Sequence, residues 1–318
     1  MPSPVSGVTV TRRDLSDLAT DYSLEQSLRG YIAMAIMPMY EVLEQSGIYP
    51  KLKEQQEARV GLDERAPTAA YDRTDWEFTD ANYTTKERGL ENPVSDVNRK
   101  RYRSLFDSDA VGTRVVVDRI LRDREYRVAT LVESQTAHAV TTSWATAASA
   151  TPQSDVEAGA QAILDAHGVL PNTLVLPFKV MKRVLKTADV LDNIKYTSAD
   201  AKFGNLETKK QILADFFGVD RIVVPNATYN SANEGAAYSG ADIWNDDYAF
   251  LCVTRMGDLE TGGPQWGRSF IWTEDVDGEF TTDVYREEQT RSDIIRCRTN
   301  DDLVALQPTA GYLLSNLD

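Results

Sequence analysis

The 318-residue chain has few of the residue types on which enzyme active sites depend. It contains two cysteines and two histidines, and none of them has the spacing of a metal site. It has no glycine-rich phosphate-binding motif, no HExxH and no GxSxG sequence. A catalytic triad or a zinc centre needs more converging groups than these. The sequence therefore predicts a protein that is not an enzyme and has no cofactor or catalytic metal.

Long apolar runs are also missing. The most apolar stretch, residues 31–40, contains Pro38 and is far shorter than the ~20 residues that cross a bilayer. The first residues lack the basic region and apolar run of a secretory signal. We therefore expect a cytosolic product with no membrane partner. Cys252 and Cys297 lie in strand-like runs and are expected to be buried thiols.

Positive charge is scarce, with 34 basic against 49 acidic residues and a net charge of −15. Proteins that grip nucleic acid usually carry the opposite sign, because phosphate contacts supply most of their affinity. An acidic protein repels DNA, which suits a container that must not stick to its contents. We expect any contact with DNA to be non-specific.

The first part of the chain is poor in apolar residues. Residues 1–45 read as a polar arm with at most a short helix within residues 23–37. Residues 46–98 read as extended β structure, broken by glycine and proline, with aromatic residues at alternate positions. Two-stranded hairpins are marginal alone. We therefore expect residues 1–30 and 50–85 to extend from the body and to rest on neighbouring molecules.

Residues 107–139 give the clearest helix signal. Asp107 or Ser108 can cap the helix, and His138 would end it. Pairs of opposite charge four residues apart, Asp118–Arg122 and Asp123–Arg127, support one side. The apolar stripe on the other side has helical period and consists of Thr113, Val117, Ile120, Leu121, Val128, Leu131 and Val132.

Residues 152–268 alternate between helix and strand signals, which predicts an α/β unit. A capping box of Ser154 and Glu157 would open the first helix, and Gly168 would stop it. The strand TLVLP, a helix starting at Pro177, the helix ETKKQILADFFG and the strand DRIVVP follow. Residues 269–318 return to long β runs.

Residues 99–127 hold nine basic and five acidic side chains. This composition is typical of a solvated, salt-bridged helix face. The second interpretation is a surface that neutralises an acidic patch on a neighbouring subunit.

Several passages, in this order along the chain, resemble the major capsid proteins of tailed bacteriophages of the Hong Kong 97 type. PMYEVLEQSGIYPKL is similar to the passage that leads into the extended loop of that family, and YTTKERGLENPVSDVNR to the return strand. DAHGVLPNTLVLPFKVMKRVL resembles a passage of the axial domain, and RSDIIRCRTNDDLVALQPTAGYLL the final strands. The resemblance covers nearly the whole chain and rests on the order and spacing of these passages.

The resemblance implies an α+β, Hong Kong 97-type capsid fold in four parts. Residues 1–45 would form the N-terminal arm and residues 46–98 the extended β loop. The peripheral domain, with its long spine helix, would comprise residues 99–150 and 269–300. The α/β axial domain would comprise residues 151–268 and 301–318.

The resemblance also implies a function and partners. The chain would be a structural subunit that self-assembles, through hexamers and pentamers, into the icosahedral head shell enclosing double-stranded DNA. We expect a portal as a partner, and the sequence leaves open whether a decoration protein binds. Because the arm starts directly at Met1, we also expect a separate scaffolding protein. The shell would be assembled in the host cytoplasm and would become part of the virion.

Some members of the family join a loop-tip lysine to a neighbouring subunit. No lysine lies between Lys53 and Lys86 here, so we expect no covalent cross-link. The tip instead offers Asp63, Glu64 and Arg65, and the basic stretch offers counterparts on the neighbour. These three residues, together with Arg119 and Arg122, are the candidate intersubunit contacts.

Two alternatives stay open from the sequence. The first is an encapsulin-type nanocompartment shell, which would have the same fold but would need a cargo-binding groove. The second is a cytosolic α/β hydrolytic enzyme that uses paired carboxylates, which would be a compact monomer or small oligomer.

Overall fold

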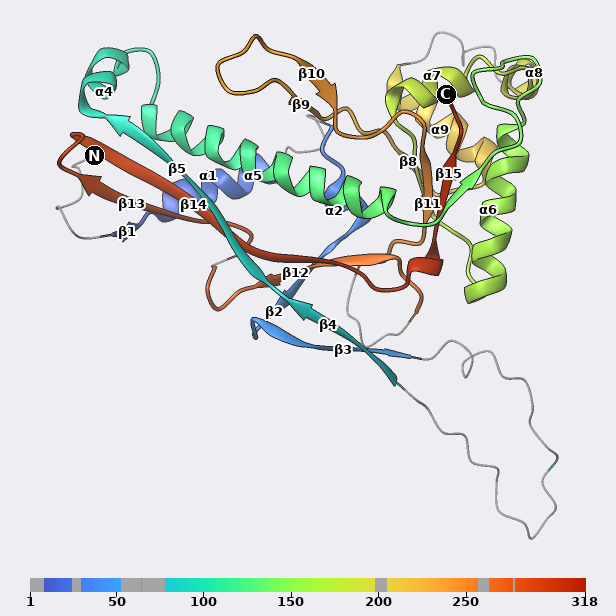
Figure 1. The fold of residues 1–318 in the computed structure, drawn as a ribbon, viewed down its shortest axis with the longest axis horizontal. Helices are drawn as coiled ribbons and strands as arrows, with labels where there is room; N and C mark the ends of the chain where they lie inside the picture. Colours follow the sequence, from blue (N-terminus) through green and yellow to red (C-terminus); the bar gives the residue numbers. More distant parts are fainter. Residues whose placement is uncertain are drawn as a thin grey trace.

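The computed structural model describes residues 9–24, 30–52, 64, 78–197, 205–256, 263–276 and 278–318. These residues form a mixed α+β fold in which one long helix lies along one of the two larger sheets and ends beside the other (Figure 1). We refer to the six-stranded sheet as the long sheet, and to the other as the five-stranded sheet.

The long helix, α5 (Ser108–Glu133), has 26 residues and is about 39 Å long. The Asp107 carboxylate caps it by accepting the Asp109 N–H at 3.0 Å, as predicted. The predicted apolar stripe is buried, apart from Leu131, which is half-buried. Two charged side chains that the pattern did not predict, Arg124 and Glu125, are buried with it.

The prediction that His138 ends this helix was wrong. The helix stops at Glu133, and His138 lies in the short strand β6 (Ala137–Ala139), which pairs in parallel with β15 (Gly311–Ser315). The His138 ring stacks on Tyr312, with ring centroids 4.1 Å apart. Backbone pairing with a distant strand therefore replaces the last helical turn.

The long sheet has the order β1-β13-β14-β12-β2, with β5 also paired to β14. Its central strand, β14 (Ser292–Ala305), pairs antiparallel with β5 along most of its length. Helix α5 packs against β5 and β14, and Gly112 allows a close approach, since a Cβ there would lie 3.2 Å from Ile295. The other strands are β1 (Val10–Thr11), β2 (Met39–Val42), β5 (Lys86–Ser95), β12 (Gly267–Trp272) and β13 (Thr281–Glu287).

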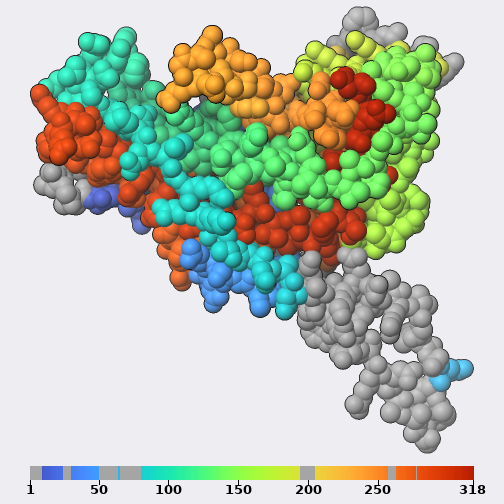
Figure 2. Space-filling model, in the orientation of Figure 1, coloured from blue at the N-terminus to red at the C-terminus, as the bar shows by residue number. Residues whose placement is uncertain are grey.

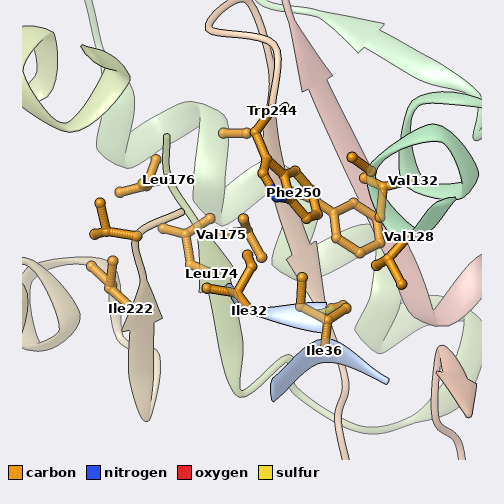
Figure 3. Packing of buried hydrophobic residues seen from close by; sticks show 14 of the residues in the cluster. Ile32, Ile36, Val128, Val132, Leu174, Val175, Leu176, Ile222, Trp244 and Phe250 are labelled. Carbon is orange, nitrogen blue, oxygen red and sulfur yellow. The ribbon is translucent and has the colours of Figure 1, made fainter. Parts of the chain in front are cut away.

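The five-stranded sheet has the order β6-β15-β11-β7-β8. Its strands supply an apolar core that continues to α5 and to the N-terminal segment, where Leu174 and Phe250 lie near Ile36 and Val128 (Figure 3). Its other strands are β7 (Thr173–Val175), β8 (Arg221–Val223) and β11 (Ala249–Cys252). The helices of this unit are α6 (Pro152–His167), α7 (Phe178–Val184), α8 (Ala188–Thr197) and α9 (Leu206–Phe217).

The helix ends in this unit follow the sequence signals with one exception. Gly168 and Gly218, both at φ 67°, terminate α6 and α9 in the left-handed conformation that glycine tolerates best. Helix α7 begins directly after Pro177. The capping box predicted for α6 was wrong, because the N-cap is Thr151, three residues before Ser154, and the helix begins at Pro152, whose ring fixes φ near the helical value.

The N-terminal segment departs from the expectation of an extended arm. Residues 9–24 fold back onto the body, where β1 pairs with β13 and helix α1 (Arg13–Leu24) packs against α5 and β13. Leu15, Ala19 and Tyr22 form the buried face of α1. Their spacing of four and three residues is helical, but they are few in a polar run, which is why the sequence pattern missed them. The short helix α2 (Ala33–Ile36) follows.

The predicted extended β structure is present at its base. Strands β3 (Ser46–Leu52) and β4 (Phe78–Thr84) form an antiparallel hairpin. Tyr83 stacks on Phe270 of the long sheet with ring centroids 4.7 Å apart, so this base does contact the body of its own chain. Most of residues 50–85, for which few such contacts were expected, lies outside the described residues.

A second hairpin was not predicted. Strands β9 (Thr228–Asn230) and β10 (Gly240–Asp242) form it, and it projects above α5 in Figure 1. Both cysteines are free and buried, as predicted, and burial raises the pKa of each thiol to about 12. Within the described ranges, no helix is both long and apolar enough to cross a membrane.

Candidate intersubunit surface

Helix α5 has a solvent-facing side, which we call the outer face of α5. It consists of residues three and four apart: Val111, Arg114, Val115, Arg119, Arg122 and Tyr126. Val111, Val115 and Tyr126 are large hydrophobic side chains that remain exposed. Apolar side chains interspersed with arginine are common at protein interfaces, so this face is a candidate contact surface.

The two sequence candidates on this face differ. The side chain of Arg119 is exposed and forms no ion pair with any other described residue. Arg122 is half-buried and donates to Asp118 at 2.8 Å. Asp118 also accepts from the Tyr31 hydroxyl at 3.0 Å, so Arg122 belongs partly to the packing of its own chain. The other expected pair, Asp123–Arg127, forms at 2.9 Å.

The turn before α5 extends this surface into a corner. Helix α4 (Asp96–Tyr102) precedes it, and Tyr102 stacks on Phe106 with ring centroids 5.2 Å apart. Val97, Leu105 and Phe106 are exposed, and Leu105 is 74% accessible. Figure 2 shows this corner, in teal, projecting at one end of the molecule. The sequence reasoning missed it, although apolar residues within a run of basic ones were the available signal.

Ion pairs join the corner to the long sheet and to α5. Arg99 donates to Asp109 at 2.7 Å and also pairs with Asp293 of β14. Arg286 of β13 bonds both oxygens of Asp96 at 2.7 Å. Burial alone would lower the pKa of Arg99, but its bonds to Asp109 and Asp293 raise the pKa above its ordinary value. The exposed side chains therefore lie on a turn whose backbone is linked to two neighbouring elements.

The basic side chains around this corner are available to a partner. Lys100, Arg101, Arg103 and Arg114 are exposed, as is Arg119. None of the five has an ion pair with another described residue. The chain as a whole has a net charge of −15, so this corner is a locally positive region on an acidic protein. It would attract an acidic surface of a further copy of the chain.

The other three candidates belong to the tip of the β3–β4 loop. Asp63 and Arg65 lie outside the described residues, and Glu64 is exposed. Of the three, only Glu64 falls within the described residues, and it forms no ion pair with Arg119 or Arg122 of its own chain. At the base of the loop, the Thr84 N–H donates to Asp302 at 2.9 Å and the Thr85 N–H to the Gln45 carbonyl at 2.9 Å.

Among the described residues, no group of three or more histidine, cysteine, aspartate or glutamate side chains could hold a metal ion. The charged side chains that do lie together form ion pairs between a cation and an anion. Such pairs primarily stabilise the fold.

The sequence has a full-length relative of known role. The major capsid protein of Burkholderia phage BcepMu is 25% identical over 315 residues, which is 96% of this chain and 95% of the relative. No family model matches the sequence. The chain resembles phage major capsid proteins. The resemblance predicted from the sequence passages is thereby confirmed.

Solved structures extend the similarity to the fold. A phage-related protein from Bordetella bronchiseptica RB50 has a TM-score of 0.73 and 21% identity, and the match covers 98% of each chain. The capsid structure of cyanophage P-SCSP1u has a TM-score of 0.56 and 10% identity, over 88% of this chain and 86% of that one. The predicted fold is confirmed as a mixed α+β phage capsid fold, and the relatives point to a structural protein that is not an enzyme.

Proposed function

We propose that this chain is the structural subunit of the icosahedral head shell of a tailed phage. The observation that carries the proposal is the end-to-end similarity to a phage major capsid protein, which covers 96% of this chain. The capsid fold over nearly the whole chain supports it. A nanocompartment shell is not favoured, because the full-length sequence relative comes from a phage.

The finer division into four parts is part of this proposal. The arm would be residues 1–45, the extended loop 46–98, the peripheral domain 99–150 and 269–300, and the axial domain 151–268 and 301–318. Two separate sheets, one beside α5 and one with α6 to α9, support the peripheral and axial domains. Strand β6 pairs with the five-stranded sheet although its residues fall in the peripheral range.

The partners follow from the shell. The subunit would form hexamers and pentamers with copies of itself and would contact packaged DNA only non-specifically. A portal, a decoration protein and a separate scaffolding protein remain predictions, as does assembly in the host cytoplasm. The mature location would be the virion.

The contacts between subunits would be non-covalent. We propose that Asp63, Glu64 and Arg65 at the loop tip meet the outer face of α5 on a neighbouring copy, with Arg119 as the main counterpart and Arg122 beside it. The exposure of Glu64 and of Arg119 supports this. Each exposed pair contributes only ~0–1 kcal/mol, but a shell repeats every contact many times.

The self-assembly can be tested by sedimentation velocity of the overexpressed full chain. We expect particles far larger than a hexamer, which negative-stain microscopy resolves as shells or related closed surfaces. The same measurement on the chain co-expressed with candidate scaffolding proteins tests whether assembly requires such a protein. A monodisperse monomer under all these conditions would overturn the proposal.

The loop-tip contact has its own test. Asp63→Lys with Glu64→Lys should leave the subunit soluble but lower the melting temperature of assembled shells. In 1 M salt, where the Debye length is ~3 Å, the difference from the wild type should shrink. The control pair Asp215→Lys with Asp220→Lys, both exposed residues of the α9 region, should leave shell stability unchanged. Denaturing gels should show only monomer. A ladder of covalent oligomers would contradict the non-covalent contact.

A further inference from the structure

The segment of residues 30–37 is wedged between α5 and the five-stranded sheet. Ile32, Ala33, Ile36 and Met37 are all buried. At its start Gly30 adopts φ +78° and lies so close to Asn226 that a Cβ would approach within 2.6 Å. The segment thus joins the N-terminal helix α1 to the rest of the fold through a tightly fitted site.

The carboxyl group of Glu125 lies at the centre of this site. Its Oε2 accepts the backbone N–H groups of Ile32 at 2.9 Å and Ala33 at 2.8 Å. Its Oε1 accepts the indole N–H of Trp244 at 2.6 Å. Ile32 cannot cap α2 with its own side chain, so a residue of α5 performs this role. One side chain thus ties together the N-terminal segment, the long helix and the loop before β11.

Glu125 is fully buried and none of its three hydrogen-bond partners is a cation. The charged and titratable groups on the surrounding elements are bonded elsewhere. These bonds are Arg124 to Glu279 and Asp301, Arg122 and Tyr31 to Asp118, Arg221 to the Ala35 carbonyl, Glu133 to the Asn245 N–H, Lys179 to Asp242, and Arg183 to Asp246. A buried carboxylate without a counter-charge is costly, because its ionised form loses hydration.

We propose that Glu125 is a positioning residue whose carboxyl group latches residues 30–37 onto α5 and the Trp244 loop, and that the latch loosens when the group loses its proton. In an assembled shell, the placement of the N-terminal segment would then depend on pH, and this part of the inference rests on the proposed function. The segment that Glu125 binds belongs to the same chain and is already bound in the structure.

The direction in which pH changes the opening of residues 30–37 follows from proton linkage. Burial, opposed by the bonds from Trp244, Ala33 and Ile32, raises the pKa of Glu125 from 4.5 to about 7. When the segment leaves, the carboxyl group meets water and its pKa returns toward the ordinary value. The protonated group therefore favours the latched state, and this preference is lost as pH rises from about 4.5 to 7. The opening equilibrium should rise by roughly three-hundredfold at most across this window.

The test is hydrogen exchange of the amides in residues 30–37, measured on the soluble full chain between pH 5 and pH 8.5 and corrected for the intrinsic rate. In the wild type we expect opening to increase with pH and to level off above neutral pH. In Glu125→Gln, which keeps the shape but cannot ionise, opening should be independent of pH. The same pH dependence in both proteins, or none in the wild type, would overturn the proposal.

Two further variants keep the test decisive. Trp244→Phe removes the donor that lowers the pKa of Glu125, so the midpoint of opening should move to higher pH. Asp123→Asn, at an exposed carboxylate of the same helix that pairs with Arg127, should leave the pH dependence of residues 30–37 unchanged. If Glu125→Gln does not fold, an unmoved midpoint in Trp244→Phe still refutes the latch. Particle formation is read separately by microscopy, so failure of the latch and failure of the shell proposal are distinguishable.

Discussion

The long sheet and the five-stranded sheet are stabilised by different interactions. The strands of the five-stranded sheet bury Leu174, Phe250 and Leu313 among other apolar side chains. The long sheet also has apolar clusters, around Ile295 and Phe270, but in addition it buries charged side chains, among them Asp293 and Asp301 of β14. The long sheet therefore depends on specific charged partners as well as on apolar contact.

The surroundings of Asp301 illustrate the second kind. This fully buried carboxylate accepts from Arg88 at 2.8 Å, Arg127 at 2.9 Å and Arg124 at 3.3 Å. Burial would raise its pKa, but the arginines, with Arg124 and Arg127 contributing most, hold it below the ordinary value. Arg124 also pairs with Glu279, which accepts from Ser23 at the end of α1. The N-terminal helix, α5 and β14 are thus fixed by one cluster of charges.

The largest expected effect comes from breaking this cluster. Arg124→Met keeps most of the volume but leaves Glu279 without its cation, and removing one partner of a buried pair costs about 3–5 kcal/mol. Denaturant unfolding of the soluble subunit measures the loss, and hydrogen exchange should accelerate in β14 before β11. Arg119→Met, on the exposed side of α5, should change stability by less than about 0.5 kcal/mol. Equal losses in the two variants would contradict the comparison.

The apolar counterpart is Leu174→Ala in β7. Strand β7 lies between β8 and β11, and the Leu174 side chain is fully buried, so its removal leaves a cavity and should cost about 2–5 kcal/mol. Here exchange should accelerate in β11 before β14. Equally early acceleration of hydrogen exchange in β14 would mean that the two sheets unfold as one unit and do not differ as we infer.

Acid provides a milder way to separate the sheets. The pKa of Asp301 is depressed, so its contribution is present above the unfolded value of 3.8 and is lost as pH falls below it through the native value. The atoms stay in place, so we expect a smaller loss than in Arg124→Met. The penalty of Arg124→Met should shrink between pH 6 and pH 3, whereas that of Leu174→Ala should stay constant. Thermal melts of both variants at each pH provide the measurement.

The smallest effect is expected at the surface of the same helix. Asp123→Asn removes the exposed partner of Arg127, which keeps its bond to Asp301. Exposed pairs contribute about 0–1 kcal/mol. A loss above 2 kcal/mol in denaturant unfolding would mean that Asp123 belongs to the buried cluster.

The same contrast explains what the sequence could predict. Helix α5, its Asp107 cap and the glycine stops were predictable because each depends on neighbours within a few residues. The burial of Arg124 was not, because its partners Glu279 and Asp301 lie 155 and 177 residues away. Helix α1 was missed because it has only three buried apolar residues, which are enough to hold the helix in place when α5 packs over them. Of the candidate surface, the exposure of Arg119 follows from its helical position, whereas the apolar corner at Leu105 was not foreseen.

We propose that the subunit completes its structure by contact with copies of itself. A cryo-electron microscopy reconstruction of particles assembled from the full chain tests it most directly. We predict icosahedral shells in which a neighbouring subunit covers the outer face of α5 and the exposed corner at Leu105 and Phe106. Particles in which both surfaces stay open to solvent, or preparations that contain only compact monomers, would contradict the account.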